Sequence, residues 1–182
     1  VVEIAAGATQ SLARHSDGSV HAWGRIPAGL VKAVESGQSL VPKEVATLSA
    51  VSQLAGGNDF SAALREDGTV WTWGLVDNND DGRRLLGRTP GTVPGAPAPV
   101  PLPGPVSRLA VGQFVTLALT HQNEQGGYEV WGWGYDNPNM LSMNGAWPLA
   151  PGLIHSSLKD TTAIAAGSSH CLAVQNDGTV LA

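Results

Sequence analysis

The stretch from Leu54 to Gly74, LAGGNDFSAALREDGTVWTWG, contains the pattern that decides the fold. A short apolar run ends at a glycine pair, and a second run of small and apolar residues follows it. The turn Asp67-Gly68 then leads into an alternating segment that ends in Trp73-Gly74. Because Asp-Gly between alternating runs is a strong hairpin signal, this stretch predicts short strands joined by tight turns.

The same pattern occurs four times along the chain, which makes it a structural repeat. The glycine that ends the first apolar run recurs after 50, 55 and 55 residues, at Gly7, Gly57, Gly112 and Gly167. The first three copies end in Trp-Gly, whereas the fourth reaches Ala182, where Trp-Gly should follow. We therefore expect a single domain over 1–182 with repeats at 1–50, 51–105, 106–161 and 162–182, the last one truncated.

The turn residues predict specific backbone conformations. An Asp-Gly hairpin turn of type I′ needs positive φ at both central residues. The glycine after each first run is expected to turn the chain sharply by adopting positive φ as well. In the third copy a longer loop with Gly126-Gly127 replaces Asp-Gly.

Composition favours a folded, turn-rich β protein. Hydrophobic residues make up 42% of the 182 residues and charged residues 14%, which is typical of a folded chain. The 23 glycines and 12 prolines separate short apolar runs, as expected of an all-β fold. The net charge is −5 and the ten Lys and Arg residues are scattered, so a nucleic-acid partner is disfavoured.

Cysteine and histidine usage predicts neither a disulfide nor a metal site of these residue types. Cys171 is the single cysteine, and it occupies the position held in the other copies by Ser11, Ser61 and Thr116. A small buried residue is therefore expected there. The five histidines show no metal-ligand spacing, and no apolar run approaches the ~20 residues of a membrane span.

The repeated pattern resembles that of the RCC1 family, named for the regulator of chromosome condensation. Its Ala-x-Gly, Ser-Leu-Ala and Asp-Gly-x-Val-x-x-Trp-Gly elements are met at 5–24, 55–74, 110–134 and 165–180. The resemblance implies an all-β propeller, or a partial one, of four-stranded blades, typically seven. Because four copies fall short of seven, we expect a section of a longer propeller; closure by a second chain and an open arc are the alternatives.

The resemblance also implies that variable loops carry the function. Nuclear members of the family exchange nucleotide on a small GTPase or bind chromatin. The repeat pattern of this chain more closely resembles that of secreted bacterial members that inhibit β-lactamases. In those, the loop after the repeat glycine presents aromatic and acidic residues to a protein. The matching positions suggest Asp59, Phe60 and Phe114 as partner-binding residues, with the alternative that both phenylalanines belong to the core.

The connectors between repeats supply further candidates. Tyr135 and Trp147 are aromatic residues that could anchor a partner, or could instead pack onto the blade. Three side chains fit the first half of a calcium loop, namely Asp77, Asn79 and Asp81. The closing carboxylate is missing, since Arg88 stands at the twelfth position, and this favours a solvated turn over a calcium site.

No catalytic constellation stands out in the sequence. We therefore predict a non-enzymatic scaffold that binds a protein partner through its loops and needs no cofactor. Two other functions stay open: a guanine nucleotide exchange factor for a small GTPase, and an accessory propeller domain of a larger enzyme or surface protein. Neither nucleic acid nor membrane is expected as a partner, and self-association could close the propeller.

Overall fold

The computed structural model describes residues 1–27, 30–31, 37–76, 84–88, 92–120, 128–134, 151–154, 158, 160–168 and 170–182. Within these ranges, fifteen strands form four antiparallel sheets, and the one helical segment is a short turn at 84–86. No helix among the described residues is long and apolar enough to span a bilayer. The predicted all-β class is therefore confirmed.

Each sheet is a meander of consecutive strands, here called a blade. Blade 1 comprises β1 (Glu3–Ala6), β2 (Gln10–Arg14), β3 (Val20–Ile26) and β4 (Gly37–Glu44). Blade 2 comprises β5 (Val51–Gly56), β6 (Phe60–Arg65), β7 (Val70–Gly74) and β8 (Ala98–Pro99). Blade 3 comprises β9 (Val106–Val111), β10 (Val115–Thr120), β11 (Val130–Gly134) and β12 (Gly152–Leu153). Blade 4 comprises β13 (Thr161–Ala166), β14 (Cys171–Gln175) and β15 (Val180–Leu181).

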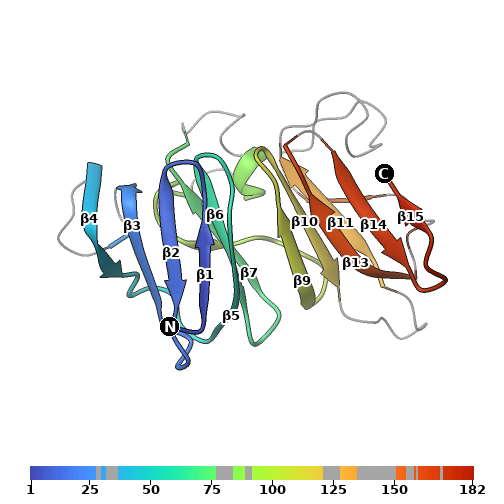
Figure 1. The fold of residues 1–182 in the computed structure, drawn as a ribbon, viewed down its shortest axis with the longest axis horizontal. Coiled ribbons are helices and arrows are strands. Elements are labelled where there is room, and N and C mark those ends of the chain that lie inside the picture. Colours follow the sequence, from blue (N-terminus) through green and yellow to red (C-terminus); the bar gives the residue numbers. More distant parts are fainter. Residues whose placement is uncertain are drawn as a thin grey trace.

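The blades stand side by side in chain order, from blade 1 at one end of the molecule to blade 4 at the other (Figure 1). Their first strands are neighbours, because β5 contacts β1 and β9, and β9 in turn contacts β13. The later strands of each meander lie progressively farther from this row. Equivalent positions of successive blades therefore meet along the row of first strands.

The core lies between blades. Trp73 of β7 belongs to one apolar cluster with Leu12 and Val20 of blade 1. Trp133 of β11 belongs to a second cluster with Val70 of blade 2. Both indoles are almost fully buried, and burial of a large apolar side chain contributes about 1.5–3 kcal/mol. In blades 2 and 3 the tryptophan of the Trp-Gly pair thus attaches its blade to the preceding one.

The Asp-Gly turns differ from the type I′ prediction. In blade 2 the Arg65 N–H donates to the Thr69 carbonyl and the Gly68 N–H to the Arg65 carbonyl, both at 2.9 Å. Gly68 has φ +80°, whereas Asp67 is not among the positive-φ residues. This is a three-residue hairpin loop in which only the glycine is left-handed. The Asp67 carboxylate accepts from the Thr69 N–H at 2.9 Å, which stabilises the aspartate in an ordinary turn conformation.

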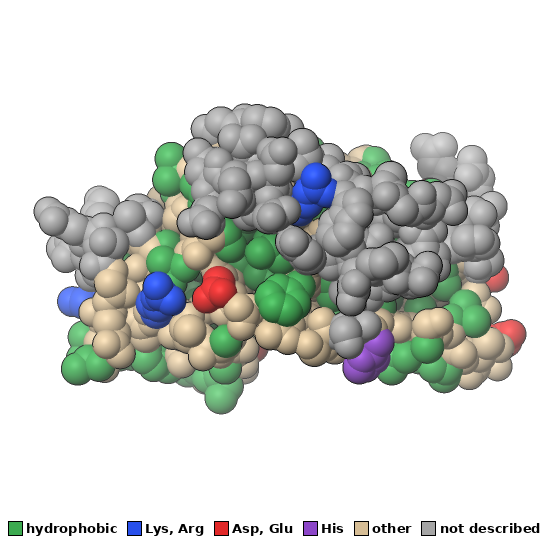
Figure 2. Space-filling model, turned by 90° about the horizontal axis from the view of Figure 1, so that it is seen from above, with side chains coloured by type: hydrophobic (Ala, Val, Ile, Leu, Met, Phe, Trp, Pro, Cys, Tyr) green, Lys and Arg blue, Asp and Glu red, His purple; other side chains and the backbone are tan. Residues whose placement is uncertain are grey.

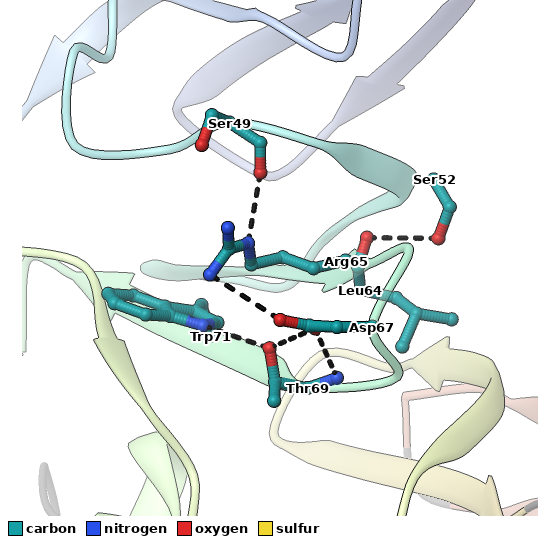
Figure 3. A network of polar contacts seen from close by, with 7 residues as sticks. All are labelled: Ser49, Ser52, Leu64, Arg65, Asp67, Thr69 and Trp71. Carbon is teal, nitrogen blue, oxygen red and sulfur yellow. Dashed lines mark hydrogen bonds and ion pairs between the residues drawn. The ribbon is translucent and has the colours of Figure 1, made fainter.

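A polar network ties this hairpin to its surroundings (Figure 3). The Arg65 Nε donates to the Ser49 carbonyl at 3.0 Å, and the guanidinium approaches Asp67 Oδ2 at 3.7 Å. The same guanidinium lies 5.6 Å from the centre of the Trp71 ring, whose Nε1 donates to the Thr69 hydroxyl at 3.3 Å. One arginine therefore contacts a carboxylate, an aromatic ring and the preceding connector together.

Candidate partner-binding site in the loops between the first two strands

Four equivalent loops connect the first strand of each blade to the second, along the upper edge in Figure 1. We call this set the loop row; its described residues are 7–9, 57–59, 112–114, 167–168 and 170. The Ala8 N–H donates to the Gly57 carbonyl at 3.1 Å, and the Asn58 N–H to the Gln113 carbonyl at 3.0 Å. A longer bond of 3.4 Å joins the Gln113 N–H to the Gly167 carbonyl. Each loop is therefore bonded to the loop of the next blade.

Close approach between blades, and not positive φ, explains the glycines that open the loops of blades 1 and 3. Neither Gly7 nor Gly112 is among the positive-φ residues, so the predicted left-handed turn is wrong at these positions. A Cβ built on Gly7 would collide with the Gly57 carbonyl oxygen, and one on Gly112 with the Gly167 carbonyl oxygen. Only a residue without a side chain lets the loops come near enough to bond.

The Trp-Gly glycine supports the loop from within its own blade. A Cβ on Gly24 would lie 2.6 Å from the Thr9 carbonyl oxygen, and one on Gly74 would lie 2.5 Å from that of Asp59. The residue after the glycine also donates its N–H to this carbonyl, at 2.7 Å in the case of Leu75 and Asp59. The backbone of Thr9 and Asp59 is thus held by the Trp-Gly glycine and the residue after it. These contacts involve the backbone carbonyl and do not constrain the side chain at this position, which we call the loop position.

The side chains at the equivalent loop positions differ from blade to blade. Thr9 is exposed, Asp59 is half-buried, and Phe114 is 36% exposed. The Asp59 carboxylate accepts a hydrogen bond from the Asn58 side-chain amide at 2.5 Å. Two of the three sequence candidates, Asp59 and Phe114, are therefore placed in neighbouring loops at a solvent-facing end of the molecule.

Phe60 is the exception among these candidates, since its side chain is fully buried. Its ring packs against the backbone of Gly57, where an added Cβ would meet the ring carbons. The alternative interpretation of Phe60 as a core residue therefore applies, and it leaves the set of candidate contact residues. Strand alternation explains the difference, because adjacent positions in an extended chain face opposite ways.

The remaining candidates lie outside the described residues. These are Tyr135, Trp147 and the calcium-loop residues Asp77, Asn79 and Asp81. In the described part of the chain, no group of three or more His, Cys, Asp or Glu side chains could hold a metal ion. Cys171, expected to be buried, is half-buried beside the blade 3 cluster.

A narrow cleft opens between blades 1 and 2 next to the loop row. Leu12, Ile26 and Trp73 form part of its apolar lining, and Arg25 and Asp59 also line it. Figure 2 shows this end of the molecule from above: a basic, an acidic and a hydrophobic side chain follow one another along its front. The described part of this end offers hydroxyls, amides, the carboxylate of Asp59, the ring of Phe114, the imidazole of His170 and the guanidinium of Arg25, which suits binding.

Polar bridges between blades were missed by the sequence interpretation. Glu3 Oε1 accepts from the Leu54 N–H at 3.0 Å, while Glu3 Oε2 takes a 2.6 Å bond from Arg14. At the equivalent position, Gln53 accepts from the Leu109 N–H at 3.0 Å and donates to the Leu109 carbonyl at 2.9 Å. One signal in the sequence could have identified these bridges. A polar residue stands immediately before the apolar run in both copies, Glu3 in the first and Gln53 50 positions later.

Comparison with known proteins identifies the repeat. Residues 51–83 match the family described as regulator of chromosome condensation (RCC1) repeat. The RCC1 domain-containing protein RUG3, mitochondrial, of Arabidopsis thaliana is 30% identical over 188 residues, covering 98% of this chain and 40% of that protein. The guanine nucleotide exchange factor SRM1 of Saccharomyces cerevisiae is 30% identical over 187 residues, covering 98% of this chain and 38% of SRM1.

A solved structure shows the same architecture. The crystal structure of Prp20p from Saccharomyces cerevisiae, a protein with binding properties to Gsp1p and histones, matches with a TM-score of 0.74 and 29% identity. The match covers 99% of this chain and 42% of Prp20p. The predicted propeller fold is therefore confirmed, and the chain spans about two fifths of the length of the relatives named here.

Proposed function

Because this chain belongs to the RCC1-type repeat family, we propose that it is a non-enzymatic scaffold that presents the loop row to a protein partner. One observation carries the proposal: the loop backbones are held by the same contacts in successive blades, while the side chains at the supported position change from Thr9 to Asp59 to Phe114. A constant backbone with variable side chains is how repeat scaffolds build specific surfaces.

The chemistry of the loop row favours a protein over other partners. An exposed phenylalanine beside hydrogen-bonding groups is typical of a protein interface, where aromatic anchors carry much of the binding energy. The net charge of −5 opposes binding of a polyanion.

The test is affinity capture from the source organism, identification of the captured protein, and calorimetric measurement of its Kd for purified variants. We expect Phe114→Ala to weaken binding by about tenfold, as for an aromatic anchor. The matched control is Glu66→Gln, an exposed residue on the hairpin at the opposite end of the β6 strand, which should leave the Kd unchanged. A partner whose Kd is insensitive to every loop-row substitution would contradict the proposal.

A second candidate, nucleotide exchange on a small GTPase, is favoured by the similarity to SRM1. A scaffold of this kind would act by binding the GTPase and lowering its affinity for nucleotide, without bond-breaking chemistry. Release of a fluorescent GDP analogue from a purified GTPase, with and without the chain, tests this function. Unchanged release rates across a panel of the organism's small GTPases would remove it.

We also propose that the chain is a section of a larger propeller. Ile4 on the outward face of blade 1 is 77% exposed, whereas its equivalent Leu54 is 4% exposed between blades. Likewise Val180 of blade 4 is 60% exposed, whereas Val20 is fully buried. These faces fit a further blade of the same kind. Light scattering over a concentration series tests the alternative, self-association, which would appear as a mass of twice 18.7 kDa.

A further inference from the structure

At two junctions, a polar side chain of one blade bonds the open backbone edge of the next blade's first strand. Glu3 Oε1 accepts from the Leu54 N–H at 3.0 Å, and Gln53 bonds both the N–H and the carbonyl of Leu109. Leu54 and Leu109 lie at positions where the first strand does not bond the second, so their backbone groups point to the open edge.

The junction of blades 3 and 4 has no such bridge. Arg108 stands at the position equivalent to Glu3 and Gln53, and Ile164 of β13 at the position equivalent to Leu109. An arginine side chain has no acceptor atom, so Arg108 cannot accept from the Ile164 N–H. In the described part of the chain, neither this N–H nor the Arg108 guanidinium has a hydrogen-bond partner.

Arg108 and Ile164 line one polar groove of about 530 Å³ along the row of first strands. The other side-chain donors of its lining are already in use. The hydroxyls of Ser52 and Ser107 donate to carbonyls of their own blades, at 3.1 and 3.0 Å, and the Gln53 amide donates to β9. The groove therefore offers a guanidinium and a backbone N–H together, with no acceptor of the chain bonded to either.

The junction of blades 1 and 2 shows which chemical group satisfies such a pair of donors. The Glu3 carboxylate accepts from the Leu54 N–H through Oε1 and from Arg14 through Oε2, the latter at 2.6 Å. One carboxylate can serve both donors because it has two acceptor oxygens, and bonds between charged groups are the stronger kind. At the junction of blades 3 and 4 the chain supplies the two donors without the carboxylate.

We propose that the groove between blades 3 and 4 binds a carboxylate group of a ligand, through the Arg108 guanidinium and the Ile164 N–H. The first strands of successive blades contact one another, as strands around the central channel of a propeller do. The site therefore lies on the channel side of the blades and is separate from the loop row. A small carboxylic acid and an acidic side chain of a polypeptide offer the same two oxygens to it.

The test is a titration of the whole chain followed by two-dimensional ¹H–¹⁵N spectra. The probes are sodium propionate, its neutral isostere propionamide, sodium chloride and the peptide acetyl-Gly-Glu-Gly-amide. We expect propionate to shift the Ile164 amide and to bind about three- to tenfold more tightly than propionamide, because only the charged group pairs with Arg108. Sodium chloride at the same concentration should leave this amide unshifted.

The peptide distinguishes the two sources of the carboxylate. If it shifts the Ile164 amide and binds at least as tightly as propionate, the ligand is an acidic side chain of a polypeptide. If propionate binds and the peptide does not, the ligand is a small acid. Either result supports the site.

The variant Arg108→Gln places at this junction the residue type that bridges blades 2 and 3. Its amide should bond the Ile164 N–H as Gln53 bonds that of Leu109, so hydrogen exchange at Ile164 should slow and propionate should no longer bind. Arg108→Lys keeps the charge without the planar fork and should weaken propionate binding by about two- to fivefold. Lys43→Gln, at an exposed position on β4, is the control for loss of one positive charge and should leave the affinity unchanged.

Equal affinity for propionate and propionamide, or unchanged propionate binding by Arg108→Gln, would overturn the carboxylate site. A shift of the Ile164 amide by sodium chloride as large as that by propionate would overturn it too, because ionic strength alone would then explain the response. None of these results bears on the scaffold proposal, which is judged by the effect of loop-row substitutions on a protein partner.

Discussion

At the scale of single residues, Gly7 and Gly112 mark places where neighbouring blades approach closely. Gly7 and Gly112 have ordinary φ, yet the space for a Cβ is occupied by a carbonyl oxygen of the next blade. These two glycines permit contact between repeats, whereas Gly57 and Gly167 leave room for the rings of Phe60 and His170 in their own blades. Sequence reasoning found the positions and gave the wrong cause, because a collision with a segment 50 or 55 residues away is invisible locally.

Substitution of Gly112 by alanine is expected to destabilise the fold. The added methyl group would collide with the Gly167 carbonyl, so blades 3 and 4 must separate at the loop row, at a cost of about 1–3 kcal/mol. Urea unfolding of the two proteins measures the difference. Gly104→Ala is the matched control, because no atom lies within 4 Å of a Cβ built there and its φ is not positive. A control variant that is equally destabilised would refute the explanation.

At the scale of secondary-structure elements, the hairpin turns share one device. Asp17, Asp67 and Asp177 each accept the N–H of the residue two positions later. The hydrogen bond from the Ser19 N–H lowers the pKa of Asp17, that from the Thr69 hydroxyl lowers the pKa of Asp67, and that from the Thr179 N–H lowers the pKa of Asp177. The negative form of each carboxylate is therefore favoured by folding.

The three lowered pKa values predict a loss of stability in acid. Since each folded-state pKa lies below the ordinary value of 3.8, the unfolded chain binds more protons in that range. Their contribution is complete above that value and is lost as pH falls through the folded-state pKa values. Urea midpoints between pH 2 and pH 6 measure the slope. The combined variant Asp17→Asn, Asp67→Asn, Asp177→Asn should show a shallower acid slope, and an unchanged slope would contradict this role.

The polar bridge of Gln53 predicts a second effect at the level of strands. In Gln53→Ala the Leu109 N–H and carbonyl lose their partners between β5 and β9, which should cost about 1–3 kcal/mol. Amide hydrogen exchange at Leu109 should accelerate together with the loss of stability. Gln38→Ala, at an exposed position on β4, is the control and should change neither quantity. Normal protection of Leu109 in Gln53→Ala would argue against the bridge.

At the scale of the whole molecule, stability resides in the junctions between blades. Trp73 and Trp133 each fill the core between their own blade and the preceding one. Trp23, the equivalent residue of blade 1, is half-buried. A repeat structure of this kind is stabilised mainly by nearest-neighbour interfaces, so equivalent substitutions in different blades need not cost the same.

The loss of stability caused by truncating each tryptophan should follow the burial of its side chain and not its position in the repeat sequence. We expect Trp73→Ala and Trp133→Ala each to cost about 3–5 kcal/mol, because a cavity opens in a blade junction. Trp23→Ala should cost markedly less. Thermal and urea unfolding followed by circular dichroism give the comparison, and an equal cost at all three positions would disagree with a junction-based core.

Local sequence was sufficient to identify the repeat, the all-β class and the family of this protein. These features follow from the spacing of apolar, Gly and Trp residues within about 20 positions, because hairpins form between neighbouring segments of the chain. The same reasoning placed Asp59 and Phe114 in loops. For Phe60, one residue beyond the loop position, it left two interpretations open, a contact residue and a core residue. The sequence alone does not distinguish a phenylalanine at the loop position from one at the next position.

Only the tertiary structure decided which of these loop residues face solvent and which loops meet. Phe60 is buried against Gly57 at the first position of β6, whereas Phe114 lies at the loop position and is partly exposed. The loops meet because the blades stack at a fixed register, set by glycine contacts and polar bridges between residues 50 to 56 positions apart. Such long-range contacts depend on how the surfaces of two neighbouring repeats fit together, and the sequence pattern of a single repeat does not specify that fit. The meeting of these two loops, through the bond from the Asn58 N–H to the Gln113 carbonyl, is a property of two blades together.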